Sequence, residues 1–225
     1  MAQINRNFFF TQVRRTLFAN NLRQSQVDGV NAILDGWEAK YAADDDRWLA
    51  YALATTYHET DQHMQPIEEY GKGRGLPYGK PDPTTGQVYY GRGFVQLTWE
   101  RNYKTMTDLL GVDFVNHPDL ALELDNATNI MFMGMIKGLF TGKSLANYFN
   151  QTTDDWVNAR KIINGLDKAQ AIAMYGHNFY SAISYTTRRE YSPENPRSAR
   201  QWRIRDRVGG ANAASRASVW LSGWC

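Results

Sequence analysis

The sequence alternates between segments with helical spacing and one long stretch that favours irregular backbone. Residues 61–95 hold seven of the eighteen glycines and four of the seven prolines. Glycine and proline at this density favour turns and loops, and a long loop inside a compact domain is usually functional. We therefore expect a helical domain with one long insert, which contains a hairpin turn near Gly86 and a short strand over residues 88–90.

Apolar residues recur at helical spacing on both sides of this insert. They predict helices over residues 7–18, 25–41, 45–60, 98–110, 126–140, 154–165 and 168–185. In the second of these, Ser25 is the expected cap, and one buried face is marked by Val27, Val30, Leu34, Trp37 and Tyr41. Thr98 is the expected cap of the fourth helix and Gly111 its end. The chain is thus predicted to be mainly α-helical, without internal repeats.

Length and charge favour one domain with a short appendage. A chain of 225 residues, 43% of them hydrophobic, can bury a substantial core. The overall charge of +2 implies no polyanionic partner, but residues 188–225 carry eight arginines against three acidic residues, a net charge of +5. We expect a catalytic domain over residues 1–187. The Arg-rich extension over residues 188–225 is expected to pack on that domain or to contact an anionic envelope, with no specific nucleic-acid partner.

The chain shows no feature of a secreted protein. Its only cysteine is Cys225, so no disulfide within the chain can form. The N-terminus offers one run of three apolar residues, Phe8 to Phe10, whereas a signal peptide needs about 7–15. No segment approaches the roughly 18 apolar residues of a membrane span. The protein is expected to stay in the cytoplasm unless something else releases it.

The strongest candidate for chemistry is Glu59. The apolar run over residues 48–57 predicts a buried helix with Glu59 at its C-terminal end. The helix dipole and apolar surroundings both disfavour the ionised carboxyl, as a general acid requires. Glu68 and Glu69 follow on the insert, and two carboxyl groups across a cleft can hydrolyse a glycoside. On spacing alone, ordinary surface acids explain the three residues better.

Metal and phosphate sites are not supported. A helical zinc site needs histidines at positions i and i+4, whereas His58 and His63 are five residues apart. The glycines of residues 71–75 lack the strand-then-helix context of a dinucleotide site, so a substrate-lining loop is the better interpretation. No metal and no cofactor is expected.

Two motifs resemble the family 19 glycoside hydrolases, which comprise chitinases and related phage and bacterial cell-wall lysins. They are His-Glu-Thr at residues 58–60, and Tyr-Gly-Arg-Gly-Phe-Val-Gln-Leu-Thr-Trp at residues 90–99 with Asn102 and Tyr103 after it. The resemblance is strong over residues 48–103 and weaker over residues 159–183. It implies a lysozyme-like, two-lobed helical domain in which the irregular insert and a short β segment line the cleft. It also implies an inverting mechanism.

The resemblance implies roles for individual residues. Glu59 would be the general acid, Glu69 the general base with Glu68 as the alternative, and Thr98 would help to place the attacking water. Substrate contacts are implied for His58, Tyr90, Gln96, Asn102 and Asn164. The family's arginine on the last core helix has no counterpart within residues 171–183.

Three functions are compatible with these features. The leading hypothesis is a phage endolysin: a monomer, held in the host cytoplasm until lysis, that cuts β-1,4 bonds between N-acetylated sugars of peptidoglycan. The second is a chitinase acting on chitin or its oligosaccharides. The third is a non-catalytic module that binds cell walls. Such a module would not need Glu59, Glu69 and Thr98, so an enzyme is favoured.

Overall fold

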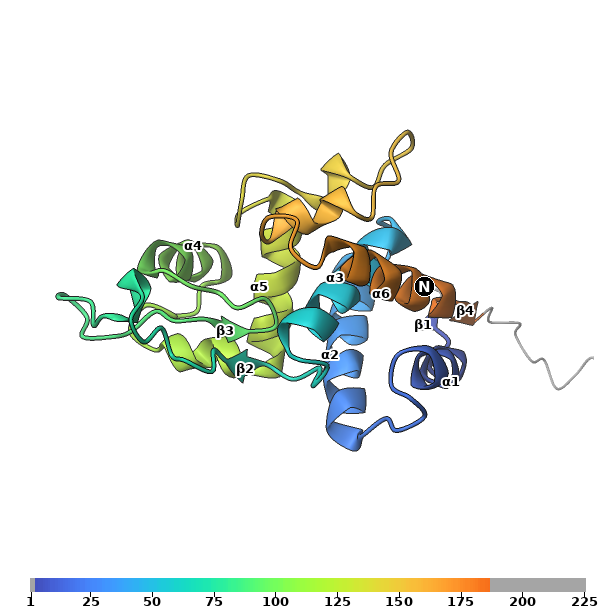
Figure 1. Ribbon diagram of the computed structural model, residues 1–225, viewed down its shortest axis with the longest axis horizontal. Helices are drawn as coiled ribbons and strands as arrows, with labels where there is room; N and C mark the ends of the chain where they lie inside the picture. Colours follow the sequence, from blue (N-terminus) through green and yellow to red (C-terminus); the bar gives the residue numbers. More distant parts are fainter. Residues whose placement is uncertain (1–2, 187–225) are drawn as a thin grey trace, which may run out of the picture. The chain divides into compact units, whose positions relative to one another are not determined.

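The computed structural model describes residues 3–186 (Figure 1). The elements in chain order are β1 (Gln3–Ile4), α1 (Arg6–Thr16), α2 (Gln24–Lys40), α3 (Asp46–Glu59), β2 (Ile67–Glu68), η1 (Pro77–Gly79), β3 (Arg92–Gly93), α4 (Glu100–Leu110), η2 (Pro118–Leu122), α5 (Leu124–Lys137), η3 (Leu145–Asn147), η4 (Asn158–Ile162), α6 (Ala169–Ala182) and β4 (Tyr185–Thr186). The Arg-rich extension predicted for residues 188–225 lies outside the described residues, so its role stays a prediction.

The described elements form two lobes on either side of α5 (Figure 1). One lobe holds α1, α2, α3 and α6, and the other holds β2, β3 and α4. In the first lobe α3 packs along α6, α1 also packs on α6, and α2 packs on α5. β1 pairs antiparallel with β4, which places Gln3 opposite Thr186. This is the mainly helical, two-lobed architecture that the sequence predicted.

Helix α3 lies at the centre of the larger lobe and fixes the position of Glu59. The side chain of Asp45 caps its first turn by accepting the Arg47 backbone N–H at 3.0 Å. Every residue from Leu49 to Ala54 is fully buried. The small side chains of this run let α6 pack closely along α3. Because α3 is held on all sides, the residue at its end is placed rigidly.

Two helix predictions need correction. Ser25 does not cap α2, because Arg23 occupies the cap position and its N–H donates to the Gln26 side chain at 2.8 Å. The helix predicted over residues 154–165 is reduced to the 3-10 turn η4. There the Asp155 carboxylate accepts the Asn158 backbone N–H at 3.0 Å. The backbone N–H of Ile163, which ends the turn, donates to the Arg160 carbonyl three residues earlier. Polar capping thus replaces a longer helix.

The strand predicted over residues 88–90 is also wrong. The insert instead pairs β2 with β3 antiparallel, Glu68 lying opposite Arg92. The carbonyls of Val88 and Tyr90 accept hydrogen bonds from the Arg92 guanidinium, at 3.0 and 3.3 Å. Because a side chain takes these carbonyls, no second strand pairs with them. The turn at Gly86 is present, since its N–H donates to the carbonyl of Asp82.

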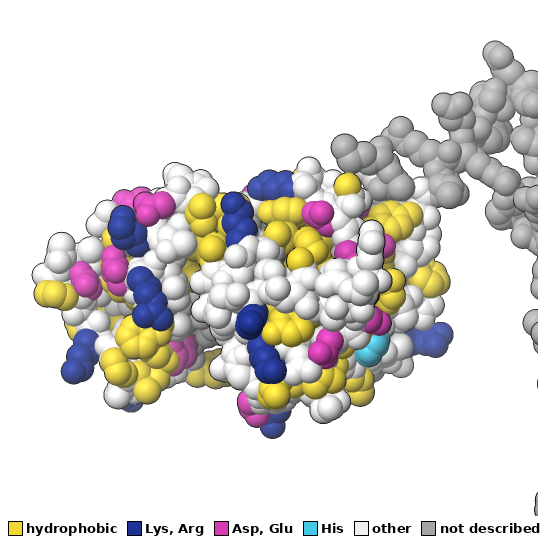
Figure 2. All heavy atoms as spheres, turned by 90° about the horizontal axis from the view of Figure 1, so that it is seen from above, with side chains coloured by type: hydrophobic (Ala, Val, Ile, Leu, Met, Phe, Trp, Pro, Cys, Tyr) yellow, Lys and Arg dark blue, Asp and Glu magenta, His cyan; other side chains and the backbone are white. Residues whose placement is uncertain are grey.

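The surface of the described residues mixes both charges. On the face shown in Figure 2, basic, acidic and hydrophobic side chains are interspersed. Polyanion binding uses an extended surface of positive charge, and this face offers none. Among residues 3–186, no helix is long and apolar enough to cross a bilayer.

Candidate active site

A cleft of about 440 Å³ collects most of the predicted site residues. It receives one carboxyl group from the end of α3 and another from the segment after β2, and its far wall comes from the chain between η4 and α6. The predicted residues that line it are Glu59, Glu69, Gln96, Thr98, Asn102 and Asn164. The remaining lining comes from Tyr78, Gly91, Val95, Leu97, Trp99, Arg101, Phe140 and Ile163. Residues up to 105 positions apart in the chain therefore meet here.

Glu59 is the last residue of α3, as predicted, but its surroundings are not wholly apolar. Its Oε1 accepts a hydrogen bond from the Arg160 guanidinium at 2.5 Å. The Arg160 side chain is 5% exposed and that of Glu59 is 17% exposed. Arg160 also donates from Nε to the carbonyl of Asp167 at 3.2 Å. A buried guanidinium anchored at two points thus holds one oxygen of the candidate acid.

The structure separates the two candidate bases. Glu69 lines the cleft, where Oε1 accepts from the Tyr78 hydroxyl at 3.1 Å and Oε2 accepts from the Gly91 N–H at 3.1 Å. Glu68 instead pairs with Lys72 at 2.8 Å and accepts the Tyr90 hydroxyl. Successive residues of an extended chain point to opposite sides. Only Glu69 is therefore oriented toward the cleft.

The backbone between Gln96 and Trp99 is strained in a way that shapes the cleft. Both residues have positive φ angles, 52° and 72°, which non-glycine residues adopt rarely and at a cost. The Trp99 N–H donates to the Tyr89 carbonyl at 2.9 Å, which holds the turn. The prediction that Thr98 caps α4 is wrong, because Trp99 occupies the cap position. The Thr98 carbonyl instead accepts from the Asn102 amide at 2.7 Å.

The amide side chains in the cleft are tethered through one atom each. Gln96 donates from Nε2 to the carbonyl of Ile67 at 3.2 Å. A Cβ atom added at Gly91 would lie 2.8 Å from the Oε1 atom of Gln96, so only glycine fits at position 91. Asn164 accepts the Gly165 N–H through Oδ1 at 2.8 Å. The untethered amide atoms are the groups available to sugar hydroxyls and acetamido groups.

Three predicted residues are not among those that line the cleft: Glu68, Tyr90 and His58. The Tyr90 ring stacks on the Arg92 guanidinium, whose centre lies 3.6 Å from the ring centroid. His58 is half-buried near the end of α3, and burial lowers the pKa of its imidazole. The motif around Glu59 and the later Tyr-Gly-Arg-Gly block therefore also hold structural residues.

Two arginines matter whose roles no sequence pattern predicted. Arg92 is 4% exposed and donates from Nε to Asp119 at 2.9 Å and from Nη1 to the Tyr103 hydroxyl at 3.1 Å. It ties the insert to α4 and η2. Arg160 binds Glu59. The only sequence signal for Arg92 is its place inside the motif, and Arg160 offers none, because its partner is 101 residues away.

Metal chemistry has no ready ligand set in the described part of the chain. No three side chains of His, Cys, Asp or Glu in that part lie close enough together to hold an ion.

Comparison with known proteins identifies the relatives of this fold. The family model described as chitinase class I, family 19 of the glycoside hydrolases, matches residues 43–160. Chitinase 3 of Oryza sativa subsp. japonica is 33% identical over 89 residues, which cover 33% of this chain and 28% of that protein. Inactive chitinase-like protein 1 of Hevea brasiliensis is 45% identical over 47 residues, 19% of this chain and 15% of that protein. The chain thus spans less than a third of the length of these curated relatives.

A solved structure supports the same assignment at the level of fold. The crystal structure of a bacterial family 19 chitinase superposes with a TM-score of 0.51 at 22% identity, covering 79% of this chain and 93% of that chain. At this identity the likeness concerns the fold alone, and it agrees with the two-lobed helical domain described above. Since the family model covers more than half of the sequence, the chain belongs to glycoside hydrolase family 19.

Proposed function

We propose that this protein hydrolyses β-1,4 bonds between N-acetylated sugars by single displacement with inversion. The observation that carries the proposal is that Glu59 and Glu69, on different elements, line one cleft together with Gln96, Thr98 and Asn102. An inverting glycosidase needs an acid and a base on opposite sides of the scissile bond, with their carboxyl groups about 6.5–9.5 Å apart. No metal is needed for this chemistry.

In the proposed reaction Glu59 donates a proton to the glycosidic oxygen as the bond to the anomeric carbon breaks. A water molecule attacks that carbon from the opposite face, and Glu69 accepts the proton that the water loses. The Tyr78 hydroxyl and the Gly91 N–H orient the Glu69 carboxylate, and Arg160 orients Glu59 through Oε1. This leaves Oε2 of Glu59 as the atom that carries the transferred proton.

Chitin and its oligosaccharides are the better-supported substrates. The rice relative is named a chitinase, and the matching family model describes class I chitinases. The cleft residues available to a substrate are mainly neutral amides and aromatic rings. The exposed Trp99, which packs edge-on against Tyr78 at 5.3 Å, offers a surface for an uncharged sugar ring.

Peptidoglycan is the second candidate, and Arg101 favours it. Of the described residues that line the cleft, it is the one with a cationic side chain. Its guanidinium lies 5.6 Å from the Trp99 ring centroid and joins none of the ion pairs within residues 3–186. Peptidoglycan carries carboxylates and chitin carries none. The endolysin hypothesis, with a monomer stored in a host cytoplasm until lysis, belongs to this candidate.

The deciding experiment is mass spectrometry of the products released from chitin and from purified peptidoglycan. Wild type and Glu59→Gln are run side by side, because one relative in sequence is named inactive and activity has to be measured directly. Chitin oligosaccharides from wild type alone would support the main proposal. Muropeptides from wild type alone would support the second candidate. Products from neither glycan, with binding retained, would leave only the non-catalytic module.

Arg101 provides an independent test of substrate choice. A charge-assisted hydrogen bond is worth about 1.5–3 kcal/mol, so Arg101→Gln should lower peptidoglycan hydrolysis by about 10-fold or more and leave chitin hydrolysis unchanged. Lys104→Gln, on the exposed face of α4, is the matched control. An equal effect of Arg101→Gln on both glycans would rule out carboxylate recognition by this residue.

A further inference from the structure

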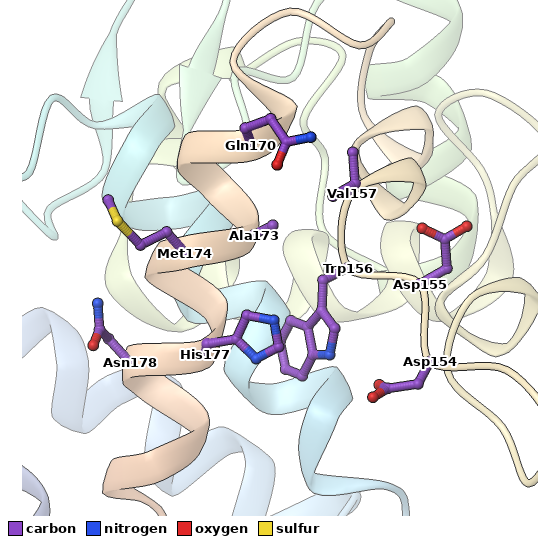
Figure 3. A pocket seen from close by; sticks show the side chains of 9 residues that line it. All are labelled: Asp154, Asp155, Trp156, Val157, Gln170, Ala173, Met174, His177 and Asn178. Carbon is purple, nitrogen blue, oxygen red and sulfur yellow. The ribbon is translucent and has the colours of Figure 1, made fainter. Parts of the chain in front are cut away.

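A second concave site lies outside the cleft, between α6 and the loop that precedes η4. This groove has a volume of about 500 Å³, within the range of about 300–1,000 Å³ typical of ligand sites. Gln170, Ala173 and His177 face it from α6, spaced so that they share one side of the helix (Figure 3). Asp154 and Trp156 face it from the loop (Figure 3). None of these residues lines the cleft.

The floor of the groove is rigid and aromatic. Trp156 is 4% exposed, and its ring lies against Gly176, where an added Cβ would come within 2.7 Å. The His177 ring packs over the same indole, with centroids 4.4 Å apart (Figure 3). Tyr180 lies at the end of this row, 5.8 Å from Trp156, and is 43% exposed. The groove is thus built by packing and does not depend on a flexible loop tip.

The rim of the groove is polar, and each of its two carboxylates is held by a neighbouring side chain. Asp154 accepts from the Arg47 guanidinium at 3.2 Å and remains 60% exposed. Both carboxylate oxygens of Asp155 accept hydrogen bonds from Asn158, one from the backbone N–H at 3.0 Å and one from the side-chain amide at 2.8 Å. The amide of Gln170 and the imidazole of His177 add donors and acceptors on the opposite side. The exposed His177 ring over a buried indole, with amide and carboxylate groups around it, suits a neutral, hydroxyl-rich ring better than a polyanion or an apolar chain.

The groove is joined to the cleft by one short segment. Residues 154–157 line the groove and Ile163 and Asn164 line the cleft, with only η4 between them. Arg160, the partner of Glu59, lies in that segment. A polymer held at the groove is therefore held close to the site that is proposed to cut it.

We propose that the groove over α6 is a second binding site for N-acetylated sugar units of the same β-1,4 glycan. The assignment rests on the proposed function, since it takes the glycan to be the substrate of the cleft. The site retains polymeric substrate and plays no part in bond cleavage. A weak second site raises the affinity for a polymer well beyond that of either site alone, by up to about 10²–10⁴-fold, but leaves a ligand too short to reach both sites unaffected.

The test separates polymer binding from turnover of short substrates. The full chain carrying Gln170→Ala and His177→Ala is compared with wild type for binding to insoluble chitin and to peptidoglycan sacculi, and for hydrolysis of soluble chitotetraose. We expect polymer binding to fall by about 10-fold, within the gain that a second site provides, and chitotetraose hydrolysis to stay unchanged. Gln151→Ala with His117→Ala, both exposed and outside the groove, should bind as wild type does.

A direct measurement locates the ligand. Titration of Glu59→Gln with chitotetraose should shift the NMR signals of the His177 ring and the Gln170 side chain, whereas the signals of the His117 ring and the Gln151 side chain, which lie outside the groove, should stay in place. Unchanged polymer binding, a parallel loss in the control variant, or absence of shifts at His177 and Gln170 would overturn the assignment. Failure of the proposed function can be told apart from failure of this assignment. If the proposed function is wrong, wild type does not hydrolyse chitotetraose, whereas the binding measurements still test the groove.

Discussion

The ion pair between Arg160 and Glu59 should govern both stability and catalysis. Arg160→Met keeps the unbranched apolar part of the side chain but removes the guanidinium and its charge. Removing one partner of a buried ion pair costs about 3–5 kcal/mol. Because Glu59 is 17% exposed at the edge of the cleft, we expect a loss near the lower limit, about 3 kcal/mol. At about 2–4 °C per kcal/mol for a domain of this size, the melting temperature should fall by about 6–12 °C.

The same substitution should reduce turnover more than substrate binding. Oε1 of Glu59 loses the 2.5 Å contact that fixes it, so the carboxyl group can rotate away from the glycosidic oxygen. A displacement of about 1 Å at a reacting group costs about 10²-fold in rate. We therefore expect kcat for chitin oligosaccharides to fall by about 100-fold while KM changes little. Arg160→Lys keeps the charge but loses the second anchor at Asp167, so its kcat should lie between those of wild type and Arg160→Met.

A double-mutant cycle distinguishes pairing from a general packing defect. Thermal or urea unfolding is measured for Arg160→Met, Glu59→Gln and the double variant. If the pair is coupled, the double variant is more stable than the sum of the single losses predicts, by more than about 0.5 kcal/mol. Additive losses, or Arg160→Met with wild-type kcat and melting temperature, would refute the reasoning.

Three further predictions follow from individual contacts. Glu69→Gln should lower initial rates on chitin oligosaccharides by about 10²–10⁴-fold, whereas Glu68→Gln, which breaks only a partly exposed pair with little energetic value, should stay within a few-fold of wild type. Gly29→Ala should lower the melting temperature: helix propensity favours alanine by about 1 kcal/mol, but the added Cβ would lie 1.6 Å from the Met64 carbonyl oxygen, and overpacking costs about 1–3 kcal/mol. Burial holds the pKa of His58 below its ordinary value of 6.5, so its contribution to stability is present above that value and lost as the pH falls through the lowered pKa. Melting curves from about pH 7 to about pH 5 should therefore show a smaller loss for His58→Gln than for wild type, and parallel curves would contradict this assignment.

Local patterns determined most of the helical framework. The apolar spacing in α2 predicted its one buried face, because a helix has to bury its apolar stripe. Gly111 and Gly138 end α4 and α5 in left-handed conformations, the usual role of glycine at a helix end. Two of the predictions that failed, at Ser25 and over residues 88–90, concern positions where a side chain from another residue takes the backbone groups. Such competition cannot be seen in local spacing.

The sequence by itself placed Glu59 at the end of a buried helix and put Gln96, Thr98 and Asn102 in one motif. It favoured Glu69 over Glu68 only through the resemblance, because the two acidic residues are adjacent in the chain. Only the pairing of β2 with β3 decides which carboxylate faces the cleft, since adjacent residues of an extended chain point to opposite sides.

Arg160 shows the same limit over a longer distance. Nothing near it in the sequence marks it as the partner of Glu59, and the two residues are 101 positions apart. A buried guanidinium needs a carboxylate, but the sequence offers 23 acidic residues. The packing of α3 on α6, and the η4 segment that leads into α6, select one of them. Helical spacing is a property of neighbouring residues and can be found in the chain itself, whereas the charge that holds the candidate acid reaches it only once the η4 segment has folded beside the end of α3.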